Sequence, residues 1–481
     1  MKDYDVVIVG AGPVGLGTAI GLKACGIDNF VVLDQATEFR RVGQVVDLLP
    51  NGLKALKSLD YSTYEAVKTT GLNFSNKTRN NQGTKTAKWV QKDFEGREIQ
   101  SLPLNYDTWL AEYGEGRVSI PWYDLQATLR EQLPREQVKV NHRCINLINE
   151  TATGTIKLEF VSNTTKEINP YAHWSNQQDE SPSAQSQLEQ STLLRAKLVV
   201  GADGINSTIR RHLYQNTPYA ILGEPDYSGF AGIYCSKIDE NIPDELKAEI
   251  ESKFLQDNRV VTIATDKNNS IHNSRIVIFR FGDILGYFIH LPIKQEKLEA
   301  KTSQHLLDLA LEVLKKDGFP ENIVQLVSFS VPSQMKSRLF YIHRATLKDT
   351  LKFPDTTNLK DCIGNQPPWS RGRVVLVGDA AHGMPPFMAQ GANQGLEDAL
   401  VISTLIANVI KNNQLSNEKA IADIFNTYES LRRPLIEKIQ QATLNRTPYN
   451  SQQNKLTEYQ QQVYCRDFNQ LRESLICPPQ S

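Results

Sequence analysis

The chain has 481 residues and a formal net charge of −1 at pH 7, with 40% hydrophobic and 22% charged residues. This length allows two or more packed layers around a sizeable core, and the near-zero charge excludes an electrostatic case for nucleic-acid binding. The six cysteines are scattered without a CxxC pair, which favours reduced thiols in a cytoplasmic protein over a disulfide framework or a zinc site. No signal peptide is evident, and no apolar run reaches the ~20 residues of a membrane span, so no transmembrane segment is expected.

The N-terminus carries a dinucleotide-binding pattern. A short apolar strand is predicted over residues 6–9, a Gly-rich loop follows at once, and apolar residues then recur with helical spacing. Gly10 allows the tight turn, Gly12 lets the backbone approach a pyrophosphate, and Gly15 lets helix and strand pack closely. The phosphates are expected at the helix N-terminus, where unpaired N–H groups and the helix dipole stabilise negative charge. The loop residues predicted to bind the cofactor are Gly10, Gly12, Pro13, Val14 and Gly15.

The next predicted strand, residues 30–33, ends at Asp34, which follows Gly12 by 22 positions. A carboxylate about 20 residues after the loop holds a ribose diol and repels a 2′-phosphate. The pocket therefore favours the AMP half of FAD, or NAD, over NADP. These residues alone do not decide between FAD and NAD.

Three segments read as polar insertions. Residues 75–116 carry scattered aromatics and form either a cover near the substrate or a surface excursion. Residues 163–192 are rich in Ser, Gln, Asn and Glu, which indicates a long flexible insertion at a hairpin tip. The third insertion spans residues 352–370.

A second Gly-rich turn follows the apolar run at residues 198–200. Asp203 lies in this turn, and Arg210 lies one turn into the helix predicted after it. Asp203 either lies near a bound cofactor or caps the helix with Arg210 as its ion-pair partner. The position near the cofactor is favoured for Asp203, and both roles stay open for Arg210.

A third strand-to-helix unit begins with the apolar run 374–377. The strand leads to Gly378 and Asp379, and a Pro–Pro turn and a Gly-rich entry into a long helix follow. This order places one acid at the end of a strand and aims several backbone N–H groups beyond the turn. A second strand-end acid hundreds of residues after Asp34 suits a long cofactor that crosses the fold, so this segment favours FAD.

The sequence between these two later motifs predicts a mostly antiparallel sheet that roofs the cofactor and lines the substrate pocket. The predicted strands are residues 227–238, 259–265, 274–281, 285–291 and 324–331. After residue 399 the chain is mostly helical until Arg432-Arg433-Pro434, where the proline is expected to break the helix. The tail after about residue 445 is polar, with a helix predicted within 455–476 and no function assigned to it.

In this order the three motifs resemble the FAD-dependent monooxygenases of the aromatic-hydroxylase type, the class A flavoprotein monooxygenases, over residues 1 to about 445. The resemblance implies that Asp379 binds the ribityl chain of FAD and that the start of the long helix faces the flavin pyrimidine edge. It further implies that Asp203 lies near the pyrophosphate and takes part in handling NAD(P)H. Other cofactor-binding residues implied are Arg41, Gln44, Gly378, Pro386, Gly391, Ala392 and Asn393.

The catalytic residues stay unknown at this stage. The resemblance offers four flavin-facing backbone candidates, Pro386, Phe387, Met388 and Gln390. His382 belongs to the motif but is interpreted as structural, since the family rarely uses it for acid–base chemistry.

The expected fold class is α/β: an FAD-binding Rossmann-like domain of the glutathione-reductase type, a mostly antiparallel substrate-binding sheet domain and a C-terminal helical region. The FAD-binding domain is expected to be discontinuous, over residues 1–73, 117–225 and 370–400. The sheet domain is assigned to 226–351, and the C-terminal helices and polar tail to 401–481.

Two positions depart from the family pattern. Trp122 stands where many relatives carry an arginine against the FAD, so either it packs over the cofactor or Gln126 or Arg117 supplies the polar contact. A purely structural role for Trp122 in the core is the alternative. Ala389 stands where relatives often have glycine, and its methyl group narrows the space near the flavin.

The resemblance implies a single-component monooxygenase in which NAD(P)H reduces FAD and a flavin C4a-hydroperoxide hydroxylates or epoxidises an apolar or aromatic small molecule. Its partners are then that substrate, O2 and NADH or NADPH. Two alternatives are an oxygen-independent flavin reductase of prenyl or other double bonds, and a non-catalytic prenyl or lipid carrier on a decayed dinucleotide fold. The halogenase run Trp-x-Trp-x-Ile-Pro is absent from the sequence. The sequence does not specify the substrate, the choice of NADH or NADPH, or the oligomeric state.

Overall fold

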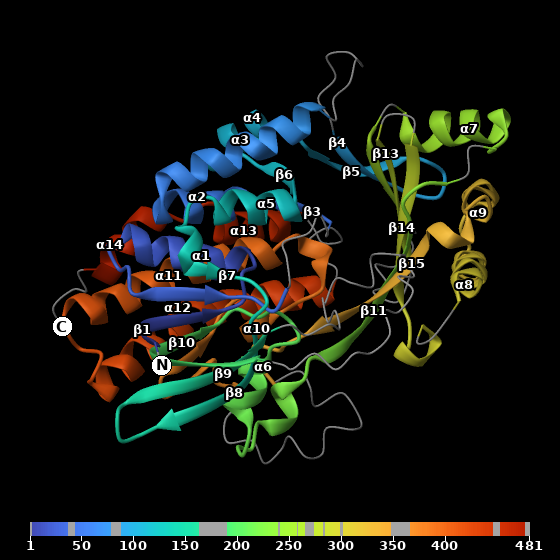
Figure 1. The fold of residues 1–481 in the computed structure, drawn as a ribbon. Coiled ribbons are helices and arrows are strands. Elements are labelled where there is room, and N and C mark those ends of the chain that lie inside the picture. The colour runs from blue at the N-terminus through green and yellow to red at the C-terminus, as the bar shows by residue number, and fades with distance from the viewer. Residues whose placement is uncertain are drawn as a thin grey trace.

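An eight-stranded sheet forms the centre of the larger of two regions, seen on the left of Figure 1. The computed structural model describes residues 2–36, 44–77, 88–162, 190–238, 241–256, 258–264, 274–281, 284–298, 302–347, 366–445 and 453–476. The strands lie in the order β16-β17-β10-β1-β2-β7, and β9 pairs with β10 and with β8. Their bounds are β1 Lys2–Val9, β2 Phe30–Leu33, β7 Val138–Lys139, β8 Arg143–Glu150, β9 Thr155–Ser162, β10 Gln190–Gly201, β16 Ser370–Arg371 and β17 Val374–Leu376.

The parallel register brings the three sequence motifs to one edge of this sheet. Strand β1 pairs in parallel with β2 and with β10, so that Val9 lies opposite both Leu33 and Gly201. Strand β10 pairs in parallel with β17, which places Gly201 opposite Leu376. The chain therefore leaves four adjacent strands at the same edge, where open α/β sheets bind their ligands.

Helices cover this sheet and bury continuous apolar strands. The run at residues 6–9 and the run at 30–33 are buried, as expected for strands covered on both faces. Each such aliphatic side chain stabilises the fold by about 1.5–3 kcal/mol. Helix α1 lies against α11, and a two-stranded sheet, β3 Val45–Leu48 with β6 Val118–Pro121, lies beside α3. The helices of this region are α1 Pro13–Ala24, α2 Pro50–Leu59, α3 Tyr61–Lys77, α4 Tyr106–Tyr113, α5 Trp122–Arg130, α6 Thr208–Tyr214, α10 Asp379–His382, α11 Gly391–Lys411, α12 Glu418–Leu444, α13 Gln453–Tyr464 and α14 Phe468–Ile476.

A seven-stranded sheet forms the second region, on the right of Figure 1. Its order is β15-β11-β14-β13-β12-β4-β5, and its pairs are antiparallel except β12 with β4. The strands are β4 Lys88–Lys92, β5 Glu98–Pro103, β11 Asp226–Cys235, β12 Val260–Ile263, β13 Arg275–Phe281, β14 Ile284–Pro292 and β15 Met335–Ile342. Helices α7 Asp244–Ile250, α8 Ser303–Lys316 and α9 Glu321–Ser328 pack on its outer side.

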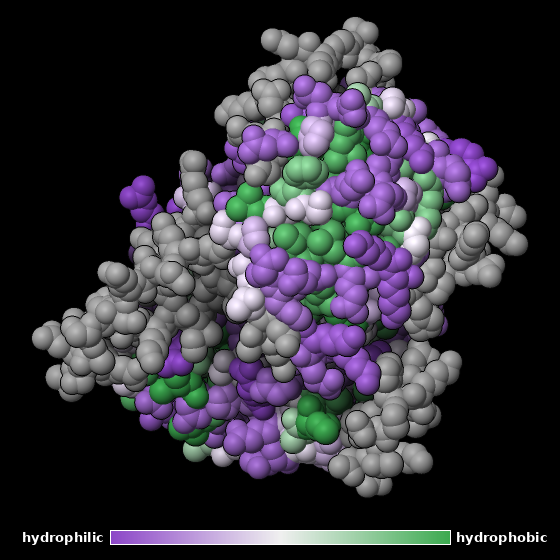
Figure 2. All heavy atoms as spheres, turned by 90° about the vertical axis from the view of Figure 1, so that its right-hand side faces the viewer, coloured by the Kyte–Doolittle hydropathy of each residue, from purple (hydrophilic) through white to green (hydrophobic). Residues whose placement is uncertain are grey.

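Alternation along β13 divides the two faces of this sheet. Ile276 and Ile278 enter the core under α8 and α9, whereas Arg275, Val277 and Phe279 face the other way. The side of the molecule that carries α7, α8 and α9 is largely hydrophilic, with hydrophobic side chains between the polar ones (Figure 2). The inner face of the sheet is therefore the one free to line a binding site.

The expected fold class is confirmed, with four local corrections. Residues 324–331 were predicted as a strand, but α9 ends at Ser328, because Ile323, Val324, Leu326 and Val327 repeat with helical spacing after Pro320. The predicted insertion 75–116 contributes α4 and two strands, β4 and β5, and the sheet domain assigned to 226–351 omitted these strands.

Pro434 does not break its helix, since α12 continues through it to Leu444. A proline inside a helix costs about 3 kcal/mol. The two preceding residues, Arg432 and Arg433, are buried and bonded to neighbouring segments, and these contacts hold both halves of α12 in place.

The remaining predicted strands of the second sheet are confirmed, and β9 and β10 pair on either side of the segment 163–189, which lies outside the described residues together with 348–365. The tail forms two helices, α13 and α14, in place of one. Within the described ranges, no helix is long and apolar enough to cross a membrane.

Candidate active site

A cavity of about 1370 Å³ lies between the carboxyl edge of the first sheet and the inner face of the second. It exceeds the ~300–1,000 Å³ of a typical single-ligand pocket and has room for two ligands. The loops after β1, β2, β10 and β17 line one side, and strands β4, β12, β13, β14 and β15 line the other.

The loop after β1 presents bare backbone to this cavity. Gly10 adopts φ +108°, and a side chain there would collide with the backbone of Ala202. A side chain at Gly12, in contrast, would meet nothing within 4 Å. Since Gly12 is the N-cap of α1, the open backbone and the helix N-terminus together form an approach for a phosphate.

Asp34 joins the end of β2 to this loop. Its carboxylate accepts the N–H of Ala11 at 2.6 Å and that of Ala36 at 2.8 Å. Burial raises the pKa of Asp34, and these two backbone bonds oppose the rise. Asp34 lines the cavity, where its remaining lone pairs are available to a ligand hydroxyl.

Asp203 both caps a helix and lines the cavity. It accepts the Ser207 hydroxyl at 2.5 Å and the Thr208 N–H at 2.7 Å at the start of α6. Burial raises the pKa of Asp203, and these bonds oppose the rise. Arg210 is not its partner: the guanidinium donates to the carbonyls of Ala380 and Ala381, at 3.0 Å each. Arg210 thus has a structural role, because its hydrogen bonds hold α10 in place.

Asp379 begins α10 directly after Gly378, which has φ +58°. Asp379 lines the cavity, and among the described residues no hydrogen bond to its carboxylate is found. Burial raises the pKa of Asp379, while the charges of His382 and Arg338 lower it. A half-buried carboxylate without a donor favours a ligand that supplies hydroxyl groups.

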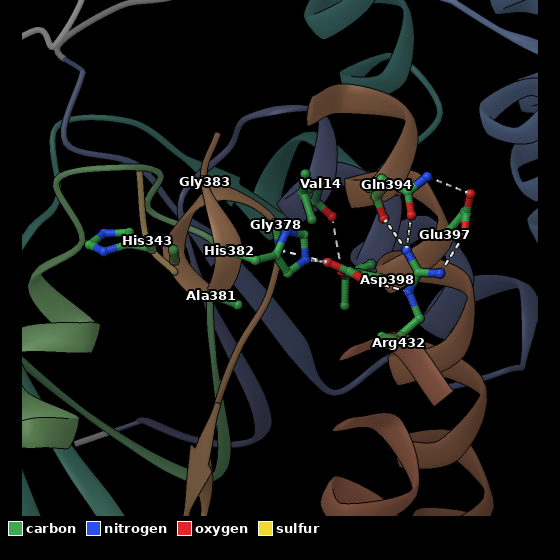
Figure 3. Close-up of polar contacts among 12 residues, drawn as sticks. Val14, His343, Gly378, Ala381, His382, Gly383, Gln394, Glu397, Asp398 and Arg432 are labelled. Carbon is green, nitrogen blue, oxygen red and sulfur yellow. Dashed lines mark hydrogen bonds and ion pairs between the residues drawn. The ribbon is translucent and has the colours of Figure 1, made fainter. Parts of the chain in front are cut away.

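A buried polar network behind Asp379 holds this turn in place (Figure 3). Asp398 accepts the Gly378 N–H at 2.9 Å, lies 2.6 Å from His382 Nε2, and accepts Arg432 Nε at 2.8 Å. Burial alone raises the pKa of Asp398, but His382 and Arg432 outweigh it and hold the value at about 2. The same guanidinium pairs with Glu397, which also accepts Asn51 Nδ2 at 2.8 Å.

The motif histidine lies in this network and not in the cavity. His382 is 1% exposed, and its ring faces Asp398. This geometry agrees with the structural role interpreted from the sequence.

Arg117 faces the cavity close to the departure at Trp122. It is 3% exposed and pairs with Asp47, and its Nε and Nη1 have no acceptor among the described residues. Gln126 donates to the Ala11 carbonyl at 2.6 Å, so its amide is already engaged in the loop. Of the two polar alternatives to the missing arginine, Arg117 is the one with spare donors, while Trp122 itself also lines the cavity.

Ala389 has the conformation that a glycine would adopt most easily. It follows η10, the 3-10 turn Pro386–Met388, in the left-handed region with φ 52°. An alanine there costs roughly 1–2 kcal/mol. Its side chain packs against a hydrophobic cluster that contains Trp109 and Tyr464, which offsets part of that cost.

An aromatic group closes the cavity between this turn and the second sheet. Phe387 of η10 lies with its ring centre 4.9 Å from His290, 5.4 Å from Phe230 and 5.5 Å from Phe340. These rings come from β14, β11 and β15. The wall opposite the Gly-rich loops thus carries an aromatic group.

The FAD binding domain family matches residues 3–220 and 363–443, more than half of the chain. A curated relative with 23% identity over 457 residues, covering 93% of each chain, is the 6-hydroxynicotinate 3-monooxygenase of Bordetella bronchiseptica. Another, the phenazine 1,6-dicarboxylic acid hydroxylase PhzS of Lysobacter antibioticus, is 25% identical over 457 residues, 92% of this chain and 89% of the relative. The chain belongs to the FAD-dependent monooxygenases of the aromatic-hydroxylase type.

Solved structures agree with this membership at the level of the fold. CtdE in complex with FAD and a substrate is similar with a TM-score of 0.63 and 16% identity, over 98% of this chain and 97% of that one. Klebsiella pneumoniae HpxO complexed with FAD and uric acid gives a TM-score of 0.59 and 17% identity, over 99% and 96%.

The cavity of this monooxygenase fits FAD. The open backbone at Gly12 suits the pyrophosphate, the donor-free Asp379 suits ribityl hydroxyls, and Arg117 offers unused donors. The first turn of α11 adds N–H groups that have no acceptor within the helix.

The cavity brings together most of the residues predicted to contact FAD. Those in its lining are Gly10, Gly12, Pro13, Val14, Asp34, Gln44, Asp203, Asp379, Pro386, Phe387, Met388, Gly391 and Ala392. Gly15, Gly378, Gln390 and Asn393 do not line it, and Arg41 lies outside the described residues. Their cofactor contacts stay predictions.

Asn393 acts in the structure as a brace for the cofactor side. Its side-chain oxygen accepts the Leu49 N–H at 2.9 Å, and its amide donates to the carbonyls of Asp47 at 2.9 Å and Ala389 at 2.6 Å. Because these bonds occupy the amide, the side chain positions the wall and does not reach into the cavity.

Sequence reasoning gave no role to Glu397, Asp398 or Arg432. Two adjacent acids inside an otherwise apolar helix were the available signal, since buried acids need partners. The partner lies 34 residues further along and is visible only in the fold.

Proposed function

We propose that this monooxygenase uses NADH or NADPH to reduce FAD and then inserts one atom of O2 into an aromatic or apolar small molecule. In the balanced reaction, substrate, O2, NAD(P)H and a proton give hydroxylated substrate, water and NAD(P)+. Bound FAD supplies the chemistry through the C4a-hydroperoxide that the family resemblance implies. The chain must therefore bind FAD, place the substrate beside it and exclude water.

One observation carries this proposal: a single cavity joins the dinucleotide loops to an aromatic wall. Phe387 belongs to both parts, since it lies on the turn before α11 and contacts His290 of β14. A substrate bound against this wall lies next to the segment that faces the flavin.

The start of α11 is placed to stabilise negative charge. Gly391 and Ala392 line the cavity in the first turn of a 21-residue helix. Their N–H groups and the positive end of the helix dipole favour an anionic flavin edge. Arg117 adds a fixed cation on the same side of the cavity.

The apolar side of the cavity suits a planar substrate. Rings of Phe230, His290 and Phe340 surround Phe387, and offset or edge-to-face packing is the preferred arrangement around an aromatic guest. The relatives named for 6-hydroxynicotinate and phenazine 1,6-dicarboxylic acid support an aromatic substrate.

Stopped-flow kinetics test this function. Flavin reduction by NADH and by NADPH, then reoxidation by O2, would be followed with panels of small aromatics, quinones and isoprenoids. The expected result is that an aromatic accelerates reduction and that turnover requires O2. Product formation at the same rate without O2 would indicate a double-bond reductase, and a purified protein that cannot bind flavin would indicate a carrier.

A further inference from the structure

The second sheet brings an arginine to the aromatic end of the cavity. Arg275 is the first residue of β13 and lies directly opposite His290 of β14. Residues opposite one another in an antiparallel pair share a face, with Cβ atoms about 5 Å apart. Both line the cavity, and the His290 ring is 4.9 Å from that of Phe387. A single side chain, that of His290, therefore lies between Arg275 and the flavin-facing turn.

This arginine has no acidic partner within the described part of the chain. The carboxylates that line the cavity there are Asp34, Asp47, Asp203 and Asp379, all from the cofactor side. Arg280, further along β13, pairs with Glu251, and Arg117 pairs with Asp47. Burial alone lowers the pKa of Arg275 to about 10, with no carboxylate to oppose it. A partly buried cation in such a place favours an anionic ligand.

Aromatic and aliphatic side chains share the face of the sheet that carries Arg275. The Phe288 ring lies over Gly232, and the Phe279 ring lies over Gly286, since a side chain at either glycine would collide with that ring. Val277, the next residue of β13 on the same face, also lines the cavity. The ligand that matches this wall has a planar apolar body and one anionic end.

We propose that Arg275 binds the carboxylate of an aromatic acid and so selects anionic over neutral aromatic substrates. The guanidinium offers paired N–H donors that match a carboxylate in a bidentate arrangement. The proposal rests on the proposed function only in calling this ligand the substrate. Phosphate of NAD(P)H is the other anion that could reach Arg275, and the experiment separates the two.

The experiment uses full-length, FAD-loaded protein and two matched probe pairs: benzoate with benzamide, and 2-naphthoate with 2-naphthamide. Binding is titrated through the change in flavin absorbance, without turnover. Arg275→Gln is compared with Arg275→Lys and with Lys315→Gln, a control at an exposed site on α8 outside the cavity lining. FAD content and thermal unfolding of each variant are measured first.

The wild type is expected to bind at least one acid more tightly than its amide. Arg275→Gln should weaken that acid about tenfold or more, with its amide changed less than about twofold. Arg275→Lys should restore part of the loss, and Lys315→Gln should bind the acid as tightly as the wild type does.

Three results would overturn the proposal: a wild type that prefers neither acid, equal weakening of acid and amide in Arg275→Gln, or a raised KM for NADPH or NADH with acid binding unchanged. Because the titration needs no oxygen transfer, it still tests ligand binding by Arg275 if the protein proves not to be a monooxygenase.

Discussion

The two sides of the cavity are built in different ways. The cofactor side consists of backbone and buried braces: Gly12 offers open main chain, and Asp398 holds the turn before Asp379 through Gly378 and His382. The substrate side consists of side chains from strands that are distant in sequence, such as Val277, His290 and Phe340. The first side is specified by local motifs, and the second is specified only by strand register.

This difference leads to a general expectation about substitutions. Changes on the cofactor side should alter folding or FAD affinity for every substrate alike. Changes on the substrate side should alter which molecule is accepted while FAD stays bound. The following variants either break this separation or make it sharper.

Replacing Arg432 by methionine should have the largest effect. Glu397 and Asp398, both 0% exposed, would lose their shared cation, and removing one partner of a buried charge group costs about 3–5 kcal/mol. Urea unfolding of the protein without FAD measures this loss. Lys419→Met, at an exposed site on the same helix, should change stability by less than about 0.5 kcal/mol. A loss for Arg432→Met no greater than that of the control would show that the network does not support the cofactor side.

Side chains at Gly12 should act on the cofactor and not on the fold. No atom lies within 4 Å of the added group, so the free energy of unfolding without FAD should change little. FAD affinity should fall in the order Gly12→Ala, then Gly12→Val, with roughly 100-fold expected for valine because it blocks the pyrophosphate. Fluorescence titration with FAD measures this. The control variant Gly223→Ala, at a site outside the cavity lining, should bind FAD as tightly as the wild type. An unchanged FAD affinity in Gly12→Val would mean that the phosphates bind elsewhere.

Asp379→Asn should bind FAD about tenfold more weakly, because a ribityl hydroxyl loses its charged acceptor. Without FAD the same variant should be more stable than wild type at pH 7. Burial raises the pKa of Asp379 in the folded protein above its pKa in the unfolded chain. The charged carboxylate therefore begins to destabilise the fold as pH rises through the unfolded-state pKa, and its effect is largest above the folded-state pKa.

Asp398→Asn is the matched case with the opposite sign. The pKa of Asp398 is held at about 2 in the folded protein, whereas its ordinary value is 3.8. The carboxylate therefore stabilises the fold at pH values above 3.8, and this contribution is lost as the pH falls towards 2. Thermal unfolding between pH 3 and pH 7 should therefore show the two variants diverging as pH rises. Parallel curves would contradict the assigned environments.

Ala389→Gly should have the smallest effect. Glycine adopts the left-handed conformation, at φ 52°, without strain. It also removes a methyl group that packs near Trp109 and Tyr464, and it increases the conformational entropy of the unfolded chain, and both of these effects lower stability. We expect a net change of stability within about 1 kcal/mol. A calorimetric scan measures it, and a loss above that range would assign the methyl group a larger part in holding the turn.

The extent to which the sequence predicted the molecule follows the same division. The loops at Gly12 and Asp379 were predictable because a strand, a turn and a helix N-terminus leave a local pattern. Residues 324–327 were misassigned because a short apolar run fits a buried strand as well as a helix. Strands β4 and β5 were interpreted as an insertion because β12, the strand that joins β4 to the rest of the sheet, lies about 170 residues later.

Long-range partners limited the prediction of the site in the same way. Arg432 received no role from the sequence and Asn393 was predicted only as a cofactor contact, because their positioning roles depend on contacts across 34 and 344 residues. Arg275 likewise becomes a candidate only when register places it beside His290. Side chains that act through tertiary contacts leave no local signal for pattern reasoning to detect.

Oxygen labelling tests the central claim most directly, namely that one cavity holds FAD and an aromatic substrate for oxygen transfer. FAD-loaded protein would be supplied with NAD(P)H, 18O2 and the aromatic that most accelerates flavin reduction, with a parallel reaction in 18O-labelled water. The account predicts one 18O atom per product molecule from the gas and none from the water. Product without 18O from the gas, or NAD(P)H oxidation that yields only hydrogen peroxide with every aromatic, would contradict it.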